Sequence, residues 1–138
     1  MAETIELEIV TPEKQVVRDH VEEIQIPGRN GYLGILPGHA PLITELGVGE
    51  ISYRGSDGKA AHISVAWGFV EVLPERVTIL AETALHPNEI DPAEAREELQ
   101  QGEKLWQEAG DDGDKYDEAN AVTRRAEEKL ASAEGKSL

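Results

Sequence analysis

Residues 31–42 read Gly-Tyr-Leu-Gly-Ile-Leu-Pro-Gly-His-Ala-Pro-Leu, with three glycines, two prolines and one histidine among large apolar side chains. Glycine permits backbone angles that other residues avoid, and proline fixes one of those angles. The stretch therefore predicts a rigid, shaped loop between strands, and such loops carry contacts more often than core packing. We expect Gly34 and Gly38 to adopt angles that only glycine tolerates.

The composition narrows the class of protein. The 138 residues include no cysteine, which excludes disulfides and thiolate metal sites and suits a reducing cytosol. No apolar run is long enough to span a membrane, and the acidic N-terminus does not resemble a signal peptide. The net charge of -15 argues against nucleic acid and against direct adsorption to anionic lipid. Any membrane association should therefore run through protein partners.

The chain changes character near residue 90, where the hydrophobic period moves from two towards 3.6. This predicts an α+β chain, with a β domain at residues 1–87 and a helical domain at residues 88–138. Many short strands with close turn signals indicate an antiparallel sandwich or barrel, in which we expect Phe69 to lie in the core. Trp67, beside Gly68, could instead lie on a surface that a partner's backbone approaches. The expected strands are 4–10, 15–18, 21–26, 32–35, 49–53, 60–66, 69–73 and 77–81.

The second domain predicts an antiparallel pair of helices. Asp91 is a good N-cap with Pro92 at the first helical position, and residues 110–113 form a turn that ends this helix. Asp114 is expected to cap the second helix, and Gly102 to interrupt the first at a cost of about 1 kcal/mol. The apolar stripe of the second helix is mostly alanine, so the hairpin buries little surface and is weakly held by its own packing.

No convincing catalytic group of residues is present. The histidines lack metal-ligand spacing, so we expect a structural or contact role for His39 and no bound metal. The segment from Gly31 to Gly34 lacks the Gly-Lys-Ser/Thr ending of a phosphate loop. The adjacent acids Glu97 and Glu98 fit a solvated helix face better than an acid–base pair. A binding or mechanical part is therefore favoured over a free enzyme.

Arg124 and Arg125 are adjacent cations, and Lys129 follows Arg125 by four residues on the same helix face. Two interpretations remain open. Local pairing with Glu128 would make these residues an ordinary solvated face. Alternatively, they form a basic strip directed at an acidic partner.

The pattern Gly31-x-x-Gly34-x-x-Pro37-Gly38-His39-Ala40-Pro41 resembles the epsilon subunit of bacterial F-type ATP synthases, as do residues 68–72, residues 77–84 and the two-helix tail. The resemblance implies a β-sandwich of about ten strands followed by a helical hairpin. It also implies a non-catalytic central-stalk (rotor) subunit that couples the gamma subunit to the c-ring of a proton-transporting synthase. Such a subunit lies peripherally at the cytoplasmic face of the bacterial cell membrane, which it contacts only through partner subunits.

The same resemblance assigns partner-binding residues. In the family, the helices fold onto the sandwich or extend transiently into the alpha/beta catalytic head, where they block ATP hydrolysis. By this resemblance the strip Arg124, Arg125 and Lys129 meets an acidic segment of the catalytic subunit. The side facing the c-ring carries Arg29, Asn30, Gly31, Tyr32 and His39. Many relatives have an acidic residue at the position of Tyr32.

Relatives that bind ATP carry Ile-Asp-x-x-Arg-Ala at the start of the first helix. This chain keeps Ile90, Asp91 and Ala95 as a remnant, but Glu94 replaces the arginine and should repel phosphate. We therefore expect no cofactor. Two other hypotheses stand beside the rotor subunit: a free β-sandwich binding module with an unrelated helical partner, and, more weakly, an enzyme that uses His39.

Overall fold

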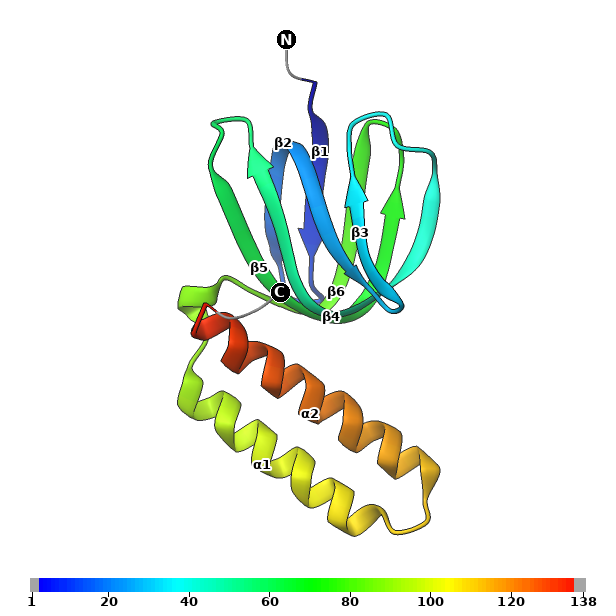
Figure 1. Ribbon diagram of the computed structural model, residues 1–138, viewed down its shortest axis with the longest axis vertical. Helices are drawn as coiled ribbons and strands as arrows, with labels where there is room; N and C mark the ends of the chain where they lie inside the picture. The colour runs from blue at the N-terminus through cyan, green and yellow to red at the C-terminus, as the bar shows by residue number, and fades with distance from the viewer. Residues whose placement is uncertain (1–2, 136–138) are drawn as a thin grey trace. The chain divides into compact units, whose positions relative to one another are not determined.

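The computed structural model describes residues 3–135, which form six strands followed by two α-helices (Figure 1). The chain divides into two compact units between His86 and Pro87. The strands are β1 (Ile5–Val10), β2 (Gln15–Gly28), β3 (Gly31–Ile35), β4 (Leu42–Gly55), β5 (Ala60–Val72) and β6 (Arg76–Leu85). The helical elements are the 3₁₀ turn η1 (Pro87–Glu89), α1 (Pro92–Ala109) and α2 (Gly113–Ala133).

The strands close on themselves. They are hydrogen-bonded in the order β1-β6-β5-β4-β2-β3, and β1 also pairs with β2, so five strands form a ring with β3 attached to β2. Neighbouring strands run antiparallel except β1 and β6, which are parallel. Closure leaves few open strand edges, which protects the sheet from pairing with other chains.

The described residues contain six strands, fewer than the ten that the resemblance implies and the eight ranges predicted above, because two long strands continue where we predicted breaks. β2 passes through residues 19–20 and β5 through residues 67–68 without ending. β4 begins at Leu42, seven residues earlier than predicted, and pairs with β5 from its first residue. Register shifts in β2 let the strand bend without losing its partners.

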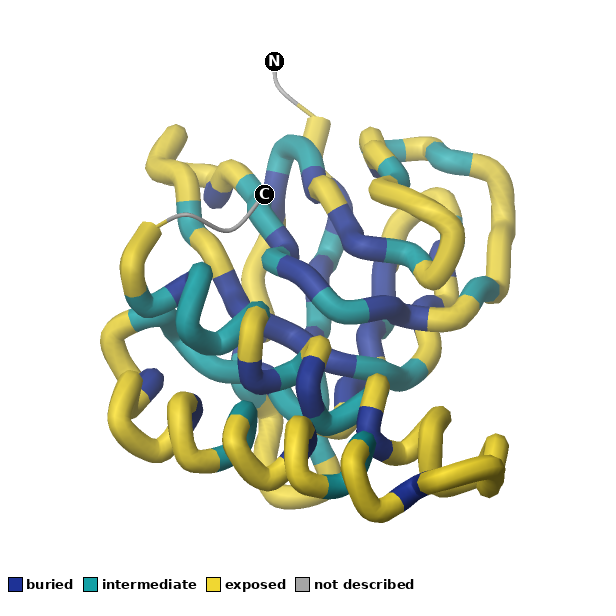
Figure 2. Tube along the Cα trace, turned by 60° about the horizontal axis from the view of Figure 1, so that its bottom comes forward, coloured by how far each residue is buried: buried dark blue, intermediate teal, exposed yellow. Residues whose placement is uncertain are grey.

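Large aliphatic side chains fill the sandwich core. Ile5, Leu7 and Ile9 of β1 are fully buried, as their alternation predicts, while the glutamates between them lie on the other face. Ile79 on β6 is likewise fully buried. Figure 2 shows buried positions recurring along the strands, whereas the two helices are mostly exposed.

The helical hairpin has a seam of small residues. The buried positions of the two helices are Ala95, Gly102, Ala109, Ala119, Thr123, Ala126 and Ser132. Helix α1 runs through Gly102 without interruption, contrary to our expectation. A Cβ atom at this position would lie 2.5 Å from the Thr123 Oγ1, so glycine allows the two helices to approach closely.

The N-cap of α1 is the predicted residue, whereas the N-cap of α2 is not. Asp91 caps α1 by accepting hydrogen bonds from the Ala93 and Glu94 amides, as predicted. The cap of α2 is Asp112, not Asp114, because the helix begins at Gly113 and the Asp112 carboxylate accepts from the first turn.

Candidate partner-binding surfaces

The turn between β2 and β3 holds two of the predicted contact residues, Arg29 and Asn30. The Arg29 Nη1 lies 2.6 Å from the Glu45 Oε2 on β4, and its backbone amide also donates to the Glu45 carbonyl. This carboxylate raises the pKa of Arg29 above its ordinary value through a hydrogen bond and charge attraction. Gly31, with φ of 133°, completes the turn in a conformation that favours glycine.

Tyr32 follows this turn on β3 and is 45% exposed. Its hydroxyl accepts a hydrogen bond of 3.1 Å from the Glu50 amide on β4. A side chain at position 49 would collide with this hydroxyl and with Pro27, so Gly49 makes room for the ring. Tyr32 thus presents one aromatic side to solvent from a fixed position.

His39 lies in the loop that joins β3 to β4. Its Nδ1 is 2.7 Å from the Ala40 carbonyl oxygen, and since a carbonyl can only accept, this nitrogen carries the proton. The Gly38 amide donates to the Pro74 carbonyl, which fixes the loop to the β5–β6 turn. Gly38 has φ of 84°, as expected for a position that favours glycine, whereas Gly34 has no positive φ and differs from our expectation.

The structure does not bring all five predicted c-ring residues together. Arg29 and Asn30 precede β3 and His39 follows it, so they lie at opposite ends of this strand (Figure 1). Five residues of strand separate the two ends by roughly 16 Å. The β2–β3 turn and the His39 loop therefore form two separate surfaces.

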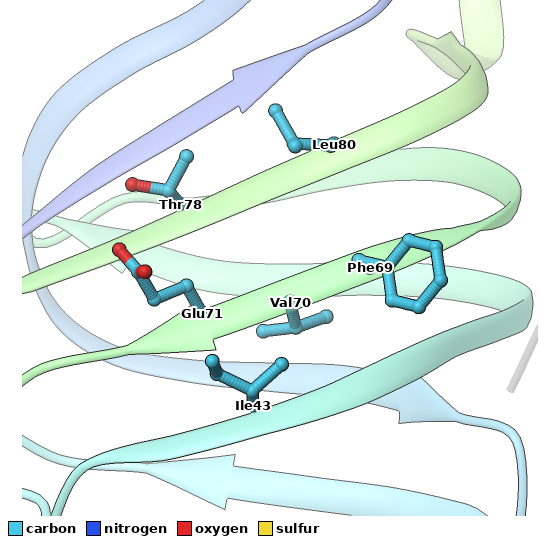
Figure 3. Close-up of a pocket in the computed structure, with 6 residues that line it drawn as sticks. All are labelled: Ile43, Phe69, Val70, Glu71, Thr78 and Leu80. Atoms are coloured by element: carbon cyan, nitrogen blue, oxygen red, sulfur yellow. The ribbon is translucent and has the colours of Figure 1, made fainter.

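A third surface, which the sequence did not reveal, lies on the outer side of β4, β5 and β6. We call Ile43, Phe69 and Leu80 the apolar face; they are 74%, 58% and 53% exposed. Phe69 and Leu80 are direct cross-strand partners, and Figure 3 shows the three side chains on three neighbouring strands. They line a hollow of about 240 Å³ together with Val70, Glu71 and Thr78. Exposed apolar groups gathered in this way mark interaction sites.

The prediction of a core position for Phe69 is wrong. Val70 and Val72 are buried, so alternation along β5 places Phe69 on the outer side with Glu71. Gly68, which we considered with Trp67 as part of a surface that a partner could approach, has a reason within this chain to be glycine. A Cβ atom there would collide with the Leu80 carbonyl of this chain's own β6, and the φ of 142° further favours glycine.

The predicted basic strip is divided in the structure. Arg124 is exposed, whereas the Arg125 and Lys129 side chains are 28% and 15% exposed and both reach Glu98 on α1. The Lys129 Nζ lies 2.8 Å from one Glu98 oxygen, and the Arg125 Nε lies 3.6 Å from the other. Glu98 is therefore not a solvated residue of an acidic face but the centre of an ion cluster.

The remnant of the nucleotide motif forms ordinary helix-start structure. Ile90 and Ala95 are buried, and the Asp91 carboxylate is occupied by its two cap hydrogen bonds. Across residues 3–135, no group of three or more acidic or histidine side chains could hold a metal ion. No helix in that range is long and apolar enough to cross a membrane.

The β unit matches a known family. A family model described as the ATP synthase, Delta/Epsilon chain, beta-sandwich domain covers residues 4–87, more than half of the chain. The chain belongs to this family. The ATP synthase epsilon chain of Koribacter versatilis (strain Ellin345) is 60% identical over 110 residues, covering 80% of this chain and 77% of that one. The epsilon chain of Solibacter usitatus (strain Ellin6076) is 46% identical over 138 residues, covering 99% and 100%.

Solved structures share the fold. A chain in the cryo-EM structure of the Euglena gracilis mitochondrial ATP synthase, OSCP/F1/c-ring, matches with a TM-score of 0.77 at 21% identity, covering 94% of this chain and 81% of that one. A chain of the Tetrahymena thermophila mitochondrial ATP synthase central stalk/c-ring matches with a TM-score of 0.54 at 16% identity, covering 62% and 69%.

These matches confirm the family resemblance and the fold class of a β-sandwich followed by two helices. The chain is an epsilon-type subunit of an ATP synthase, a non-catalytic part of that complex. This assignment replaces the hypotheses of a free binding module and of an enzyme that uses His39.

Proposed function

We propose that this subunit couples gamma to the c-ring through two surfaces of its β-sandwich. The apolar face binds gamma, and the β2–β3 turn with Arg29, Asn30, Gly31 and Tyr32 faces the c-ring. The observation that carries the proposal is the exposure of Ile43, Phe69 and Leu80 on adjacent strands. Burying such a side chain contributes about 1.5–3 kcal/mol of favourable free energy. Because these side chains are exposed in the free subunit, this free energy is gained only when a partner covers them.

The surroundings of the apolar face support this assignment. Glu45 lies opposite Phe69 across the strand pair, and Glu71 lies opposite Ile43, so carboxylates border the apolar side chains. Interfaces commonly combine an apolar centre with a polar rim. The His39 loop leads directly into β4 at Leu42, so His39 belongs to the gamma side in this arrangement. The subunit then lies peripherally at the cytoplasmic face of the bacterial membrane, held there by its partners.

We further infer that the C-terminal helices restrain ATP hydrolysis by entering the alpha/beta catalytic head transiently. Arg124, Arg125 and Lys129 supply the charge that an acidic segment of that head would attract. Charge pairs desolvated in an interface cost about 2–5 kcal/mol when one partner is truncated. Proton coupling itself belongs to other subunits.

The gamma surface is tested by measuring binding of purified gamma to the full chain by isothermal titration calorimetry. Ile43→Ser and Phe69→Ser should each weaken binding at least about tenfold, since each removes a buried apolar anchor. Both side chains are exposed in the free chain, so melting should change little. Tyr116→Ser, which removes an exposed aromatic ring from α2, is the matched control and should bind as wild type. Unchanged gamma affinity in both sandwich variants would reject this surface.

The restraint of hydrolysis is tested in the assembled complex. Removing residues 88–138, or replacing Arg124, Arg125 and Lys129 with alanine, should raise the ATP hydrolysis rate. The triple variant should also loosen the hairpin, because two of its three cations pair with Glu98. Hydrolysis at the wild-type rate in both complexes would show that the helices do not restrain this enzyme.

A further inference from the structure

Glu98 lies on the helix seam, among buried residues that are all small. It lies three residues after the buried Ala95 and four before the buried Gly102, so it faces the second helix. Across the seam, Arg125 and Lys129 flank the buried Ala126. These three charged groups, Glu98, Arg125 and Lys129, are here called the Glu98 clasp.

The clasp joins residues that are far apart in sequence. Glu98 and Lys129 are 31 positions apart, and their hydrogen bond of 2.8 Å is partly buried. The three side chains are between 15% and 28% exposed, so water screens them less than an ordinary surface pair. The fully buried residues of the seam are alanine, glycine, threonine and serine, which bury little apolar area. The clasp and the hydrogen bond from Trp106 to Asn120 add polar side-chain contacts that join the two helices among the described residues.

The charges of the clasp do not balance. One carboxylate faces two cations, which leaves one positive charge uncompensated within the cluster. An acidic partner with several carboxylates could satisfy both cations more completely than Glu98 does. The chain as a whole has a net charge of -15 and should repel such a partner elsewhere.

We propose that Glu98 is an internal substitute for the acidic partner, so that Glu98 and the catalytic head compete for Arg125 and Lys129. With the clasp closed, the two cations are held inside the hairpin. With the clasp open, they are available to the head. The competition rests on the restraint of hydrolysis proposed above. That the clasp holds the hairpin closed, which we call the lock, does not rest on it.

The competition has a consequence that simple stabilisation lacks. Glu98→Gln and Lys129→Gln each break the same ion pair, so both should loosen the hairpin. Their effects on hydrolysis should nevertheless be opposite. Loss of Glu98 frees the cations and strengthens inhibition, while loss of Lys129 removes one of the groups that inhibit.

The lock is tested in the isolated full chain by hydrogen exchange of the α2 amides. Glu98→Gln should exchange about tenfold faster in α2, which corresponds to the loss of one hydrogen bond between charged groups. The sandwich strands should be unaffected and thus report that the chain is folded. The matched control is Glu97→Gln, which removes the same charge from the exposed neighbouring position and should exchange as wild type.

A double variant distinguishes loss of this one interaction from a general loss of structure. Glu98→Gln combined with Lys129→Gln should exchange little faster than Glu98→Gln alone, because Glu98→Gln already removes the ion pair with Lys129. Wild-type protection of α2 in Glu98→Gln, or fully additive effects in the double variant, would overturn the lock.

The competition is tested by ATP hydrolysis of the assembled complex. Glu98→Gln should lower the rate several-fold, Arg125→Gln with Lys129→Gln should raise it, and Glu97→Gln should leave it unchanged. A rate in Glu98→Gln at or above wild type would overturn the competition. A wild-type rate in the variant without the two cations would reject the restraint of hydrolysis, and the competition with it, while the exchange measurement still decides the lock.

Discussion

The sandwich and the hairpin are stabilised by different means. The largest fully buried side chains of the sandwich are isoleucine, leucine and valine, such as Leu7 and Ile79. No buried residue of the two helices is larger than threonine. Because apolar burial scales with area, the sandwich gains much more from each core position. The hairpin depends instead on close helix approach, caps and the Glu98 clasp.

This difference matches the work proposed for each unit. A unit that transmits torque between gamma and the c-ring benefits from a core that does not open. A unit that changes conformation needs contacts that can be exchanged for others at small cost, and a polar seam with thin packing provides these. The hydrogen bond of 2.7 Å from the Trp106 indole to the Asn120 amide oxygen belongs to the same class of exchangeable contact.

The largest effect is expected when the two units are separated. A fragment of residues 1–87 keeps every strand and the entire aliphatic core, so it should unfold cooperatively in urea. Residues 88–138 alone should be only partly helical, because isolated helices of this length are marginal in water and the seam adds little. Circular dichroism of both fragments measures this. A helical fragment that melts cooperatively with full helicity would show that the seam is stronger than its composition indicates.

A smaller effect should follow from filling the seam. Gly102→Ala improves helix propensity by about 1 kcal/mol, but overpacking typically costs about 1–3 kcal/mol. The Thr123 hydroxyl cannot easily yield, since it donates a 2.6 Å hydrogen bond to the Ala119 carbonyl. We therefore expect a net loss of helix stability, measured by hydrogen exchange of the α2 amides.

Gly113→Ala is the matched control for this substitution. Gly113 is the first residue of α2, no atom apart from the neighbouring backbone lies within 4 Å of where its Cβ would be, and its φ is not positive. Alanine there should therefore stabilise the helix by about 0.4–1 kcal/mol. The two glycine-to-alanine changes should thus have opposite signs. Stabilisation by both would mean that the helices can move apart without penalty at Gly102.

The sequence predicted the features that depend on neighbours along the chain. Alternation in β1, the Asp91 cap, the helical hairpin and its alanine-rich seam were all confirmed. The continuity of the long strands was missed, because a bend and a break share the same glycines and polar residues. The apolar face was missed because Phe69 was placed by residue type, although its alternation with Val70 and Val72 indicated the outer side.

The Glu98 clasp shows a different limit. Glu97 and Glu98 are identical in type, and only the spacing from Ala95 and Gly102 distinguishes the seam position from the exposed one. Pairing across the hairpin also requires the register of the two helices, which the turn sets. The sequence predicts a later start for α2 than the structure shows, so it does not give this register. Arg125 and Lys129 could therefore be assigned only to local pairs or to another protein.

The smallest effect concerns that turn, where Asp112 and Asp114 compete for the role of N-cap. The Asp112 carboxylate accepts hydrogen bonds of 3.1 Å and 3.2 Å from the Asp114 and Lys115 amides. Asp112→Ala should therefore cost about 1 kcal/mol of helix stability. Asp114 lies inside the first turn, where the interaction of its negative charge with the helix dipole stabilises the helix by about 0.3 kcal/mol at moderate salt. Alanine has a higher helix propensity than aspartate, which offsets the loss of this charge interaction, so Asp114→Ala should change helix stability very little. Thermal melting of the helical signal distinguishes the two residues, and Asp112→Ser should retain most of the wild-type stability because serine also caps. An equal loss in the two alanine variants would place the start of α2 beyond Gly113.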